Sequence, residues 1–557
     1  MPQVAPRMDV FDAIVVGSGA TGGWVAKELT EAGLRVAVVE AGRNLVPEKD
    51  FTEHLIPYQI RYRGYSPEVR KTRPIQARSY ACTEYNYRWF VNDLENPYTA
   101  SAERPFNWIR LRILGGRSLV WGRVSLRLSD LDFKAASRDG HGEDWPISYA
   151  DLAPYYDKVE QFIGVSGLAE GVAHVPDGKF QPPMPMFCSE AILRKTLKEK
   201  FGRHLLFGRN ANLTQPLNGR APCHYCGPCE RGCITNSYYN SPTVTLPAAE
   251  KTGRLTVITD AVVSHVTCDP DSGKATGIRY VDRLTRDVRE VRGKVVVLCA
   301  QSLESVRILL NSATRQFPNG LANSSGVLGH YLMDHFSGFG ASGVIPGADR
   351  RVWYGPPRRP TGTYIARFRN LTDRRQDYIR GFGYEVYTSP PFNPGAEGFG
   401  KEYKARVKLG DWAIHLEGYG EIVSQGENFC ELDNDVVDAR GIPALRISVD
   451  YGDNARKMAL DVAASAGEML EAAGAKEIRL HQTLDYGRHE VGAARMGNDP
   501  KKSVLNAFLQ SHDIQNLFVM DGGSFVSASC HNPTLTMMAL AVRGCEYLVE
   551  QLRKGEL

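Results

Sequence analysis

The sequence has no run of 18 or more apolar residues, so we expect no membrane-spanning helix. It also lacks a strong excess of either charge, because 67 basic and 63 acidic side chains leave a formal net charge of +4. That balance gives no support to nucleic-acid binding. The first residues, MPQVAPRMDV, contain neither the basic nor the apolar region of a signal peptide, so we expect no export signal on this chain.

Internal repeats and low-complexity tracts are absent, and the composition, 43% hydrophobic and 23% charged, is that of a globular protein. A chain of 557 residues can bury a large core, most simply in two domains. Short β-rich runs between residues 255 and 297 predict hairpins that lead into a core strand, and an alanine-rich stretch at 455–473 predicts a helix. These patterns favour an α/β protein.

The amino-terminal 40 residues predict a strand, a turn, a helix and a second strand. An apolar run at residues 12–16 leads into the motif GSGATG, and a second apolar run ends at Glu40. In this context the G-x-G-x-x-G motif is a strong signal for a dinucleotide, because its glycines let the pyrophosphate approach a helix N-terminus and Glu40 can bind ribose hydroxyls. The motif alone does not separate FAD from NAD.

Eleven cysteines are present, and four of them fall within eleven residues: Cys223, Cys226, Cys229 and Cys233. Their spacing, C-x2-C-x2-C-x3-C, is the arrangement with which bacterial ferredoxins bind iron–sulfur clusters through thiolates. A four-thiolate zinc site and unligated cysteines are the alternatives, and zinc is disfavoured because its cysteine pairs are normally separated by a longer loop. We expect the other seven cysteines to be buried apolar residues.

Several segments in order along the chain resemble the glucose-methanol-choline (GMC) family of flavin oxidoreductases. They are the opening DAIVVGSGATGGWVAKELTEAGLRVAVVEAG, LGGRSLVWGRVSLR (114–127), DWPISYADLAPYY (144–156), SSGVLGHYLMDH (324–335), HEVGAARMGNDP and DGGSFVSASCHNPTLTMMALA. The family's second signature is only partly kept in AQSLESVRILLNS (300–312). The resemblance implies the GMC fold: a Rossmann-like FAD domain (1–46, 107–335 and 483–557, with a cysteine insertion at about 215–240) and a substrate-binding domain built on a β-sheet (47–106 and 336–482).

The resemblance also implies which residues contact FAD. In the family's pyranose oxidases a histidine of the flavin loop carries the flavin covalently, and Val120 stands at that position here, which implies non-covalent FAD. The adenine contact falls on Val262 or Val263, and we assign Val263. The implied FAD-contacting residues are Gly17, Gly19, Ala20, Thr21, Gly22, Glu40, Ala41, Gly115, Gly116, Ser118, Val120, Val263, Asp521, Gly522, Asn532, Pro533 and Thr534.

Alcohol oxidation needs a base for the hydroxyl proton while a hydride leaves for flavin N5, and a neutral histidine suits that task. His489 matches the family's proton-accepting histidine, and Asn532 matches the second position, where it would hydrogen-bond the substrate oxygen. His531 is the alternative to Asn532, but adjacent side chains of an extended chain point in different directions. The other histidines, among them His335, His481 and His512, lie in no motif that indicates a catalytic role.

Some bacterial sugar dehydrogenases of this family bind a 3Fe–4S cluster through C-x5-C-x3-C, which Cys223, Cys229 and Cys233 match. Cys226 is additional and could complete a 4Fe–4S cluster. A one-electron centre beside the flavin favours a dehydrogenase over an oxidase. The resemblance further implies a small accessory subunit with a Tat signal, a cytochrome c as electron acceptor and a periplasmic location; without such a partner the chain would be cytoplasmic.

The predicted function is therefore FAD-dependent dehydrogenation of a sugar or glycoside secondary hydroxyl to a ketone, with electrons leaving through an iron–sulfur cluster. Resemblance to glucoside 3-dehydrogenases favours pyranose C3, while oxidation at C2 or C1 stays open. Two alternatives remain, an oxidase that uses oxygen and a flavoprotein that has lost its chemistry.

Overall fold

The computed structural model describes residues 10–55, 59, 67–349, 359–372, 374–375, 377–389, 399–401, 404, 411–485, 487 and 489–557. The stretch on which the expectation about a signal peptide rests, residues 1–9, lies outside that part. Within it, no helix is both long and apolar enough to cross a bilayer.

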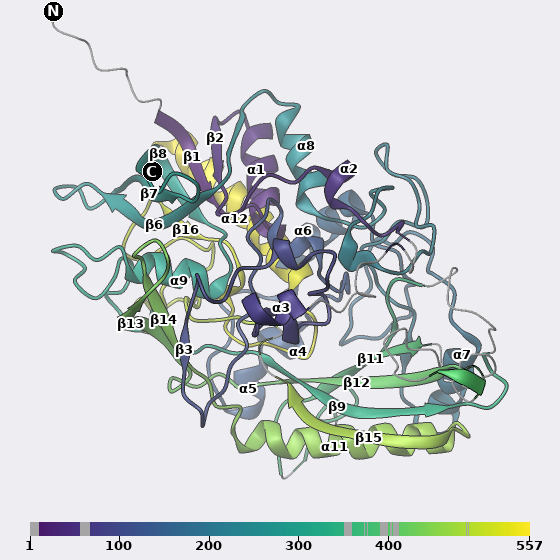
Figure 1. The fold of residues 1–557 in the computed structure, drawn as a ribbon. Helices are drawn as coiled ribbons and strands as arrows, with labels where there is room; N and C mark the ends of the chain where they lie inside the picture. The colour runs from purple at the N-terminus through teal and green to yellow at the C-terminus, as the bar shows by residue number, and fades with distance from the viewer. Residues whose placement is uncertain are drawn as a thin grey trace, which may run out of the picture.

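The first sheet has seven strands in the order β5-β2-β1-β8-β7-β6, with β16 beside β8 (Figure 1). Strands β1, β2, β5, β8 and β16 run parallel, whereas β6, β7 and β8 form the expected antiparallel hairpins. Strands β1, β2, β8 and β16 contain buried apolar runs rich in valine, as the middle of a sheet covered on both faces requires. The strands are β1 (Val10–Val16), β2 (Val36–Val39), β5 (Leu255–Ile258), β6 (Ala261–Cys268), β7 (Ala275–Asp282), β8 (Val288–Leu298) and β16 (Leu517–Val519).

The second sheet has six antiparallel strands in the order β15-β9-β12-β11-β10-β4. One face packs on α11 (Gly452–Ala472), the expected alanine-rich helix, whose small side chains allow close approach (Figure 1). A third sheet joins β13 (Phe429–Val437), β14 (Pro443–Ser448) and β3 (Thr99–Ala100). The six strands are β4 (Leu205–Leu206), β9 (His335–Val344), β10 (Thr363–Ile365), β11 (Phe382–Ser389), β12 (Ala413–Glu421) and β15 (Lys476–Asp485).

The remaining helices are mostly short, and α1 lies against β1 and β2 of the first sheet. Helix α1 packs against α12 and α8, and α12 also packs against α6. Their bounds are α1 (Ala20–Glu31), α2 (Pro47–Asp50), α3 (Pro67–Thr72), α4 (Asp130–Phe133), α5 (Ala135–Asp139), α6 (Tyr149–Ile163), α7 (Cys188–Thr196), α8 (Thr245–Glu250), α9 (Ser302–Leu310) and α12 (Thr534–Lys554).

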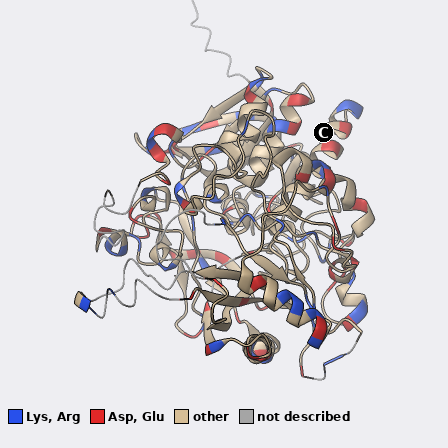
Figure 2. Cartoon of the chain, turned by 90° about the vertical axis from the view of Figure 1, so that its right-hand side faces the viewer, with Lys and Arg blue, Asp and Glu red and all other residues tan. Residues whose placement is uncertain are grey.

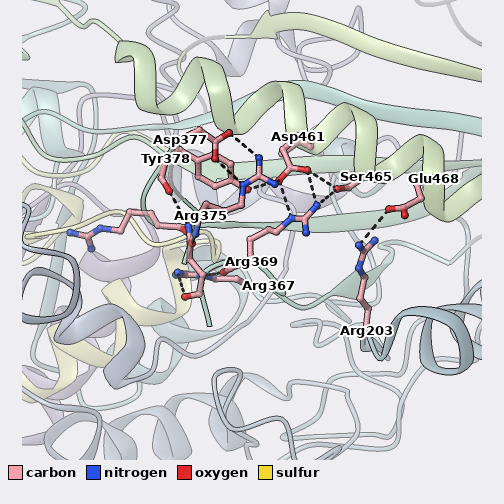
Figure 3. A network of polar contacts seen from close by, with 12 residues as sticks. Arg203, Arg367, Arg369, Arg375, Asp377, Tyr378, Asp461, Ser465 and Glu468 are labelled. Atoms are coloured by element: carbon pink, nitrogen blue, oxygen red, sulfur yellow. Dashed lines mark hydrogen bonds and ion pairs between the residues drawn. The ribbon is translucent and has the colours of Figure 1, made fainter. Parts of the chain in front are cut away.

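A polar network fastens the connection between β10 and β11 to α11 (Figure 3). The Arg369 guanidinium donates two hydrogen bonds of 2.9 Å to the carboxylate of Asp461, and the Tyr378 hydroxyl donates to the same group. These hydrogen bonds hold the pKa of Asp461 below its usual value even though burial opposes them. The network therefore holds the segment between β10 and β11 against α11. Elsewhere acidic and basic side chains are interspersed (Figure 2).

Candidate active site

The dinucleotide loop connects β1 to α1, and its glycines are required by contacts as well as by conformation. Gly17 has φ +95°, and a Cβ at Gly22 would lie 1.9 Å from the Gly17 carbonyl oxygen. A Cβ at Gly19, by contrast, would meet no atom within 4 Å, although Gly19 caps the N-terminus of α1. Two glycines therefore let the loop and helix meet, and the third leaves open space where a pyrophosphate would approach the helix N-terminus.

Glu40 follows β2 and lies against this loop. Its carboxylate accepts hydrogen bonds from the backbone and hydroxyl of Ser18 and, at 2.8 Å, from the Gly42 backbone N–H. Burial raises the pKa of Glu40, and these hydrogen bonds oppose the rise. The acid thus occupies the end of the second strand, as ribose binding in such folds requires.

The expected flavin loop is hydrogen-bonded to the dinucleotide loop. Gly115 has φ +94° and donates its N–H to the Ser18 hydroxyl at 2.8 Å. Ser118 then closes a short 3-10 turn by donating its hydroxyl to the Gly115 carbonyl. The apolar side chain of Val120, buried just after this turn, offers no atom for a covalent bond to a flavin. The residues here fit a flavin held without covalent attachment.

The two candidate adenine contacts on β6 have different surroundings. Val262 packs in a small cluster with Val281, Ile442 and Ala41, while Val263 belongs to the main core. Alternation along the strand separates the two side chains. The adenine contact of Val263 stays a prediction, and the structure places Val262 nearer to Ala41 at the end of β2.

The carboxy-terminal part of the site begins at Asp521, which caps a short 3-10 turn. Its carboxylate accepts hydrogen bonds from the Gly523 N–H at 2.9 Å and from the Ser305 hydroxyl at 2.6 Å. Burial raises the pKa of Asp521 to about 6. Gly522 lies in this turn, and Pro533 caps α12, which begins at Thr534.

Asn532 and His531 point in different directions, which separates the two candidates for the second catalytic position. The Asn532 amide donates to Glu385 on β11 at 3.0 Å, so Asn532 faces the second sheet. His531 is buried, its Nδ1 lies 3.1 Å from the Arg127 carbonyl oxygen, and its ring contacts Tyr364. Burial lowers the pKa of His531 to about 4. Both residues thus contact the second sheet, His531 at Tyr364 on β10 and Asn532 at Glu385 on β11, but only Asn532 is partly exposed.

His489, like Asn532, contacts the second sheet. Its backbone N–H donates to Asp334 at 2.6 Å, and its ring lies 5.9 Å from that of Tyr419 on β12. Its Nδ1 is 2.9 Å from Nδ1 of His335, the first residue of β9. Sequence reasoning missed His335 and Asp334, although both end the family-like segment 324–335, and it missed Glu385, which no motif marks.

Strand register places further polar groups on the sheet face that meets Asn532 and His489. Glu385 is paired across the sheet with Glu417, and Tyr387 with His415, whose rings stack at 4.8 Å. Because residues two apart share a face, Tyr419 belongs to the same surface. We call this set the facing surface: Glu385, Tyr387, His415, Glu417 and Tyr419.

The four clustered cysteines lie on one loop, which positive-φ residues at Tyr225, Gly227 and Gly232 turn back on itself. Cys229 and Cys233 are buried, whereas Cys223 and Cys226 are half-buried. Of the other seven cysteines, the expectation of burial is wrong for the exposed Cys188 and the half-buried Cys268. Backbone N–H groups lie 3.4 Å from the sulfur of Cys223 and 3.3 Å from that of Cys233. Burial, together with the neighbouring Cys233 and Cys223, raises the pKa of Cys226 to about 12. Within the described ranges, no three metal-ligating side chains are arranged around a single ion.

The segment after these cysteines contacts both cofactor loops. The Tyr238 hydroxyl donates to the Leu119 carbonyl of the flavin loop at 2.7 Å, and the Tyr239 hydroxyl donates to the Ala20 carbonyl at 3.0 Å. Tyr238 also packs against Cys229 and Cys233. One aromatic residue thus lies between the thiols and the flavin loop.

These contacts define an oxidoreductase built around a dinucleotide cofactor. The chain belongs to the GMC oxidoreductase family, whose models match residues 11–337 and 424–541. It is an FAD-dependent oxidoreductase that acts on CH–OH groups, and the α/β fold and family expected from the sequence are confirmed.

Individual proteins are similar over nearly their whole length. A 2-methyl-1,2-propanediol dehydrogenase from Mycolicibacterium austroafricanum is 30% identical, covering 97% of this chain and 95% of that one. The fructose dehydrogenase large subunit of Gluconobacter japonicus is 27% identical over 98% of each chain. The crystal structure of pyridoxine 4-oxidase from Mesorbium loti superposes with a TM-score of 0.62 at 18% identity, covering 96% of this chain and 98% of that one, which shows the shared fold.

Proposed function

We propose that this protein is a dehydrogenase that oxidises a secondary hydroxyl of a sugar or glycoside, at pyranose C3, and passes the electrons to an iron–sulfur cluster. The observation that carries the proposal is that His489 and Asn532, from separate segments, both contact the facing surface, at Tyr419 and Glu385. In addition, Tyr238, just after the cysteine loop, is hydrogen-bonded to the flavin loop. FAD, when bound, supplies the hydride acceptor.

His489 and Asn532 handle the substrate hydroxyl. The neutral imidazole of His489 takes the hydroxyl proton as the hydride leaves the carbinol carbon. Asn532 donates one amide hydrogen to Glu385, and an amide has a second hydrogen that it can donate to the substrate oxygen. Such a contact would align the oxygen and carry the charge that develops on it.

The facing surface supports a sugar as substrate. Its carboxylates, Glu385 and Glu417, are acceptors only, which suits a ligand rich in hydroxyl donors. Its aromatic rings, among them the stacked Tyr387 and His415, offer flat apolar area for the C–H face of a pyranose. The fructose dehydrogenase relative also acts on a sugar.

The cysteine loop supports an iron–sulfur cluster as electron acceptor. Its donor set is four thiols, and N–H groups directed at the sulfurs of Cys223 and Cys233 are the hydrogen bonds that tune such clusters. A cluster spreads its cysteines wider than a single ion does, because several iron atoms lie between the sulfurs. Cys223, Cys226, Cys229 and Cys233 would hold it, and Tyr238 lies between them and the flavin loop.

The same reasoning extends to partners and location. The fructose dehydrogenase relative is named as a large subunit, which supports a smaller partner for this chain. A Tat signal on that partner would carry the folded pair to the periplasm, where a cytochrome c would accept the electrons.

Anaerobic titration of the purified holoprotein with sugars, glycosides and simple diols tests the substrate class. We expect sugars or glycosides to bleach the flavin absorbance and to yield a keto-sugar oxidised at C3. His489→Gln should lower the rate of bleaching about 100-fold or more, as loss of a general base does, while dithionite still reduces its flavin. Bleaching by diols but not by any sugar would overturn the substrate assignment.

Metal analysis and turnover under argon test the electron route. We expect iron and acid-labile sulfide in the purified protein and turnover with a one-electron dye in the absence of oxygen. Zinc without sulfide, or efficient peroxide formation with no dye present, would replace the proposal with an oxidase that carries a structural metal.

A further inference from the structure

His335 lies directly beside the proposed base. Its side chain is 1% exposed at the start of β9, and its Nδ1 is 2.9 Å from Nδ1 of His489. The two rings meet edge to face, with centroids 5.0 Å apart and planes at 80°. A hydrogen bond between two imidazoles needs one donor and one acceptor, so the tautomer of one ring sets that of the other.

The tautomer of His335 follows from its second nitrogen. Its Nε2 is 3.1 Å from the carbonyl oxygen of Ala528, and a carbonyl can only accept, so Nε2 carries a hydrogen. Burial lowers the pKa of His335, although the nearby carboxylates of Asp334 and Glu421 oppose that shift. In the resulting neutral ring, Nδ1 is the acceptor.

His489 is therefore the donor in this pair. Its Nδ1 carries the hydrogen that His335 accepts, which places its lone pair on Nε2, on the side of the ring away from His335. With the opposite tautomer, Nε2 would carry a hydrogen and could not accept a proton from the substrate.

The backbone holds the two rings in this relation. One carboxylate oxygen of Asp334 accepts the backbone N–H groups of both histidines, at 2.8 Å from His335 and 2.6 Å from His489. Two residues from the histidines along their segments, Met333 and Val491 exchange two backbone hydrogen bonds of 2.8 and 3.0 Å. The pair is thus built on a rigid frame rather than on two independent loops.

We infer that His335 is a positioning residue that locks His489 in the tautomer with Nε2 free of hydrogen, which makes His489 a base toward the substrate hydroxyl. The tautomer follows from the geometry alone, whereas its effect on rate rests on the proposed function.

The tautomer can be read without turnover, by NMR of the oxidised holoprotein labelled with 15N-histidine. We expect the resonances that vanish in His489→Gln to include a pyrrole-type Nδ1 and a pyridine-type Nε2, which resonate far apart. A pyridine-type Nδ1 on His489 would overturn the inference, whether or not any sugar is a substrate.

Two variants test the consequence for rate. His335→Leu removes the acceptor, whereas His335→Asn keeps an acceptor oxygen near the position of Nδ1. With FAD content matched, we expect the leucine variant to lose about 10- to 100-fold in the rate of anaerobic flavin reduction, by analogy with the loss of partners that orient metal-bound histidines. The asparagine variant should keep most of the rate.

The pH profile separates positioning from a structural role. Loss of the acceptor removes a hydrogen bond that stabilises protonated His489, so the acid limb should move to lower pH in His335→Leu and stay in place in His335→Asn. Equal losses in both variants with an unmoved acid limb would show that His335 only supports the fold. If no alcohol bleaches the wild-type flavin, the proposed function fails and the NMR result still decides the tautomer.

Discussion

Alanine substitutions at Gly19 and Gly22 should separate cofactor binding from loop integrity. At Gly19 a methyl group would meet no protein atom within 4 Å, and the backbone is extended (φ −64°, ψ −159°) rather than in the left-handed region that favours glycine. The free energy of unfolding of the apoprotein should therefore change by about 0.5 kcal/mol or less. At Gly22 the same methyl would lie 1.9 Å from the backbone oxygen of Gly17, which no side-chain rotation can relieve.

The size of each effect follows from what the methyl group meets. In Gly19→Ala it fills the space beside the helix N-terminus, so overpacking against the pyrophosphate should cost about 1–3 kcal/mol, or roughly 5- to 150-fold in FAD affinity. In Gly22→Ala the loop itself must move, so about 2 kcal/mol or more should be lost from the apoprotein as well as from FAD binding.

Fluorescence titration of the apoprotein with FAD measures the affinity, and thermal unfolding of the same apoprotein measures stability. The wild-type protein, treated in the same way, serves as the control for handling. Unchanged FAD affinity in Gly19→Ala would refute the placement of the pyrophosphate, and unchanged apoprotein stability in Gly22→Ala would refute the packing argument.

Three further predictions concern charge and the cysteine loop. Burial raises the pKa of Asp521 from 3.8 to about 6 in the folded protein, so its contribution to stability is largest below pH 4. That contribution, ~3 kcal/mol, is lost as pH rises through 6. In Asp521→Asn, thermal unfolding of the apoprotein should depend less on pH between 4 and 6, and an unaltered pH dependence would contradict this. Cys229→Ser should lower the iron content, measured by metal analysis, whereas the exposed Cys188→Ser should leave it unchanged, and equal iron in both would count against the loop as ligand. Glu160→Gln should destabilise the protein by about 1–3 kcal/mol, because the buried Arg127 loses its two-pronged carboxylate partner and keeps only the partly exposed Asp157. A chemical denaturation midpoint equal to that of wild type would disprove it.

The local parts of the site could be predicted from the sequence because short-range chemistry encodes them. The loop at residues 17–22 and the acid at Glu40 lie within one strand–helix–strand unit, where turn geometry and strand length leave little freedom. That His531 and Asn532 have different contacts was also predictable, since neighbouring side chains of an extended chain point in different directions.

Contacts between distant segments could not be predicted in this way. His335 and His489 are 154 residues apart, and Asn532 and Glu385 are 147 apart. Their meeting depends on how the second sheet packs against the first, and no periodicity within either segment encodes that packing. His335 in particular looks like any buried strand residue until the facing histidine is known.

The tyrosine pair that follows the cysteines has a thermodynamic consequence. Tyr238 and Tyr239 bond to carbonyls of two loops that both border the cofactor space. If the proposed cluster orders the cysteine loop and, through these tyrosines, the surroundings of the flavin, then by reciprocity FAD strengthens cluster binding by the same factor. Loss of either prosthetic group should loosen the other, so the two are expected to be loaded, and lost, together.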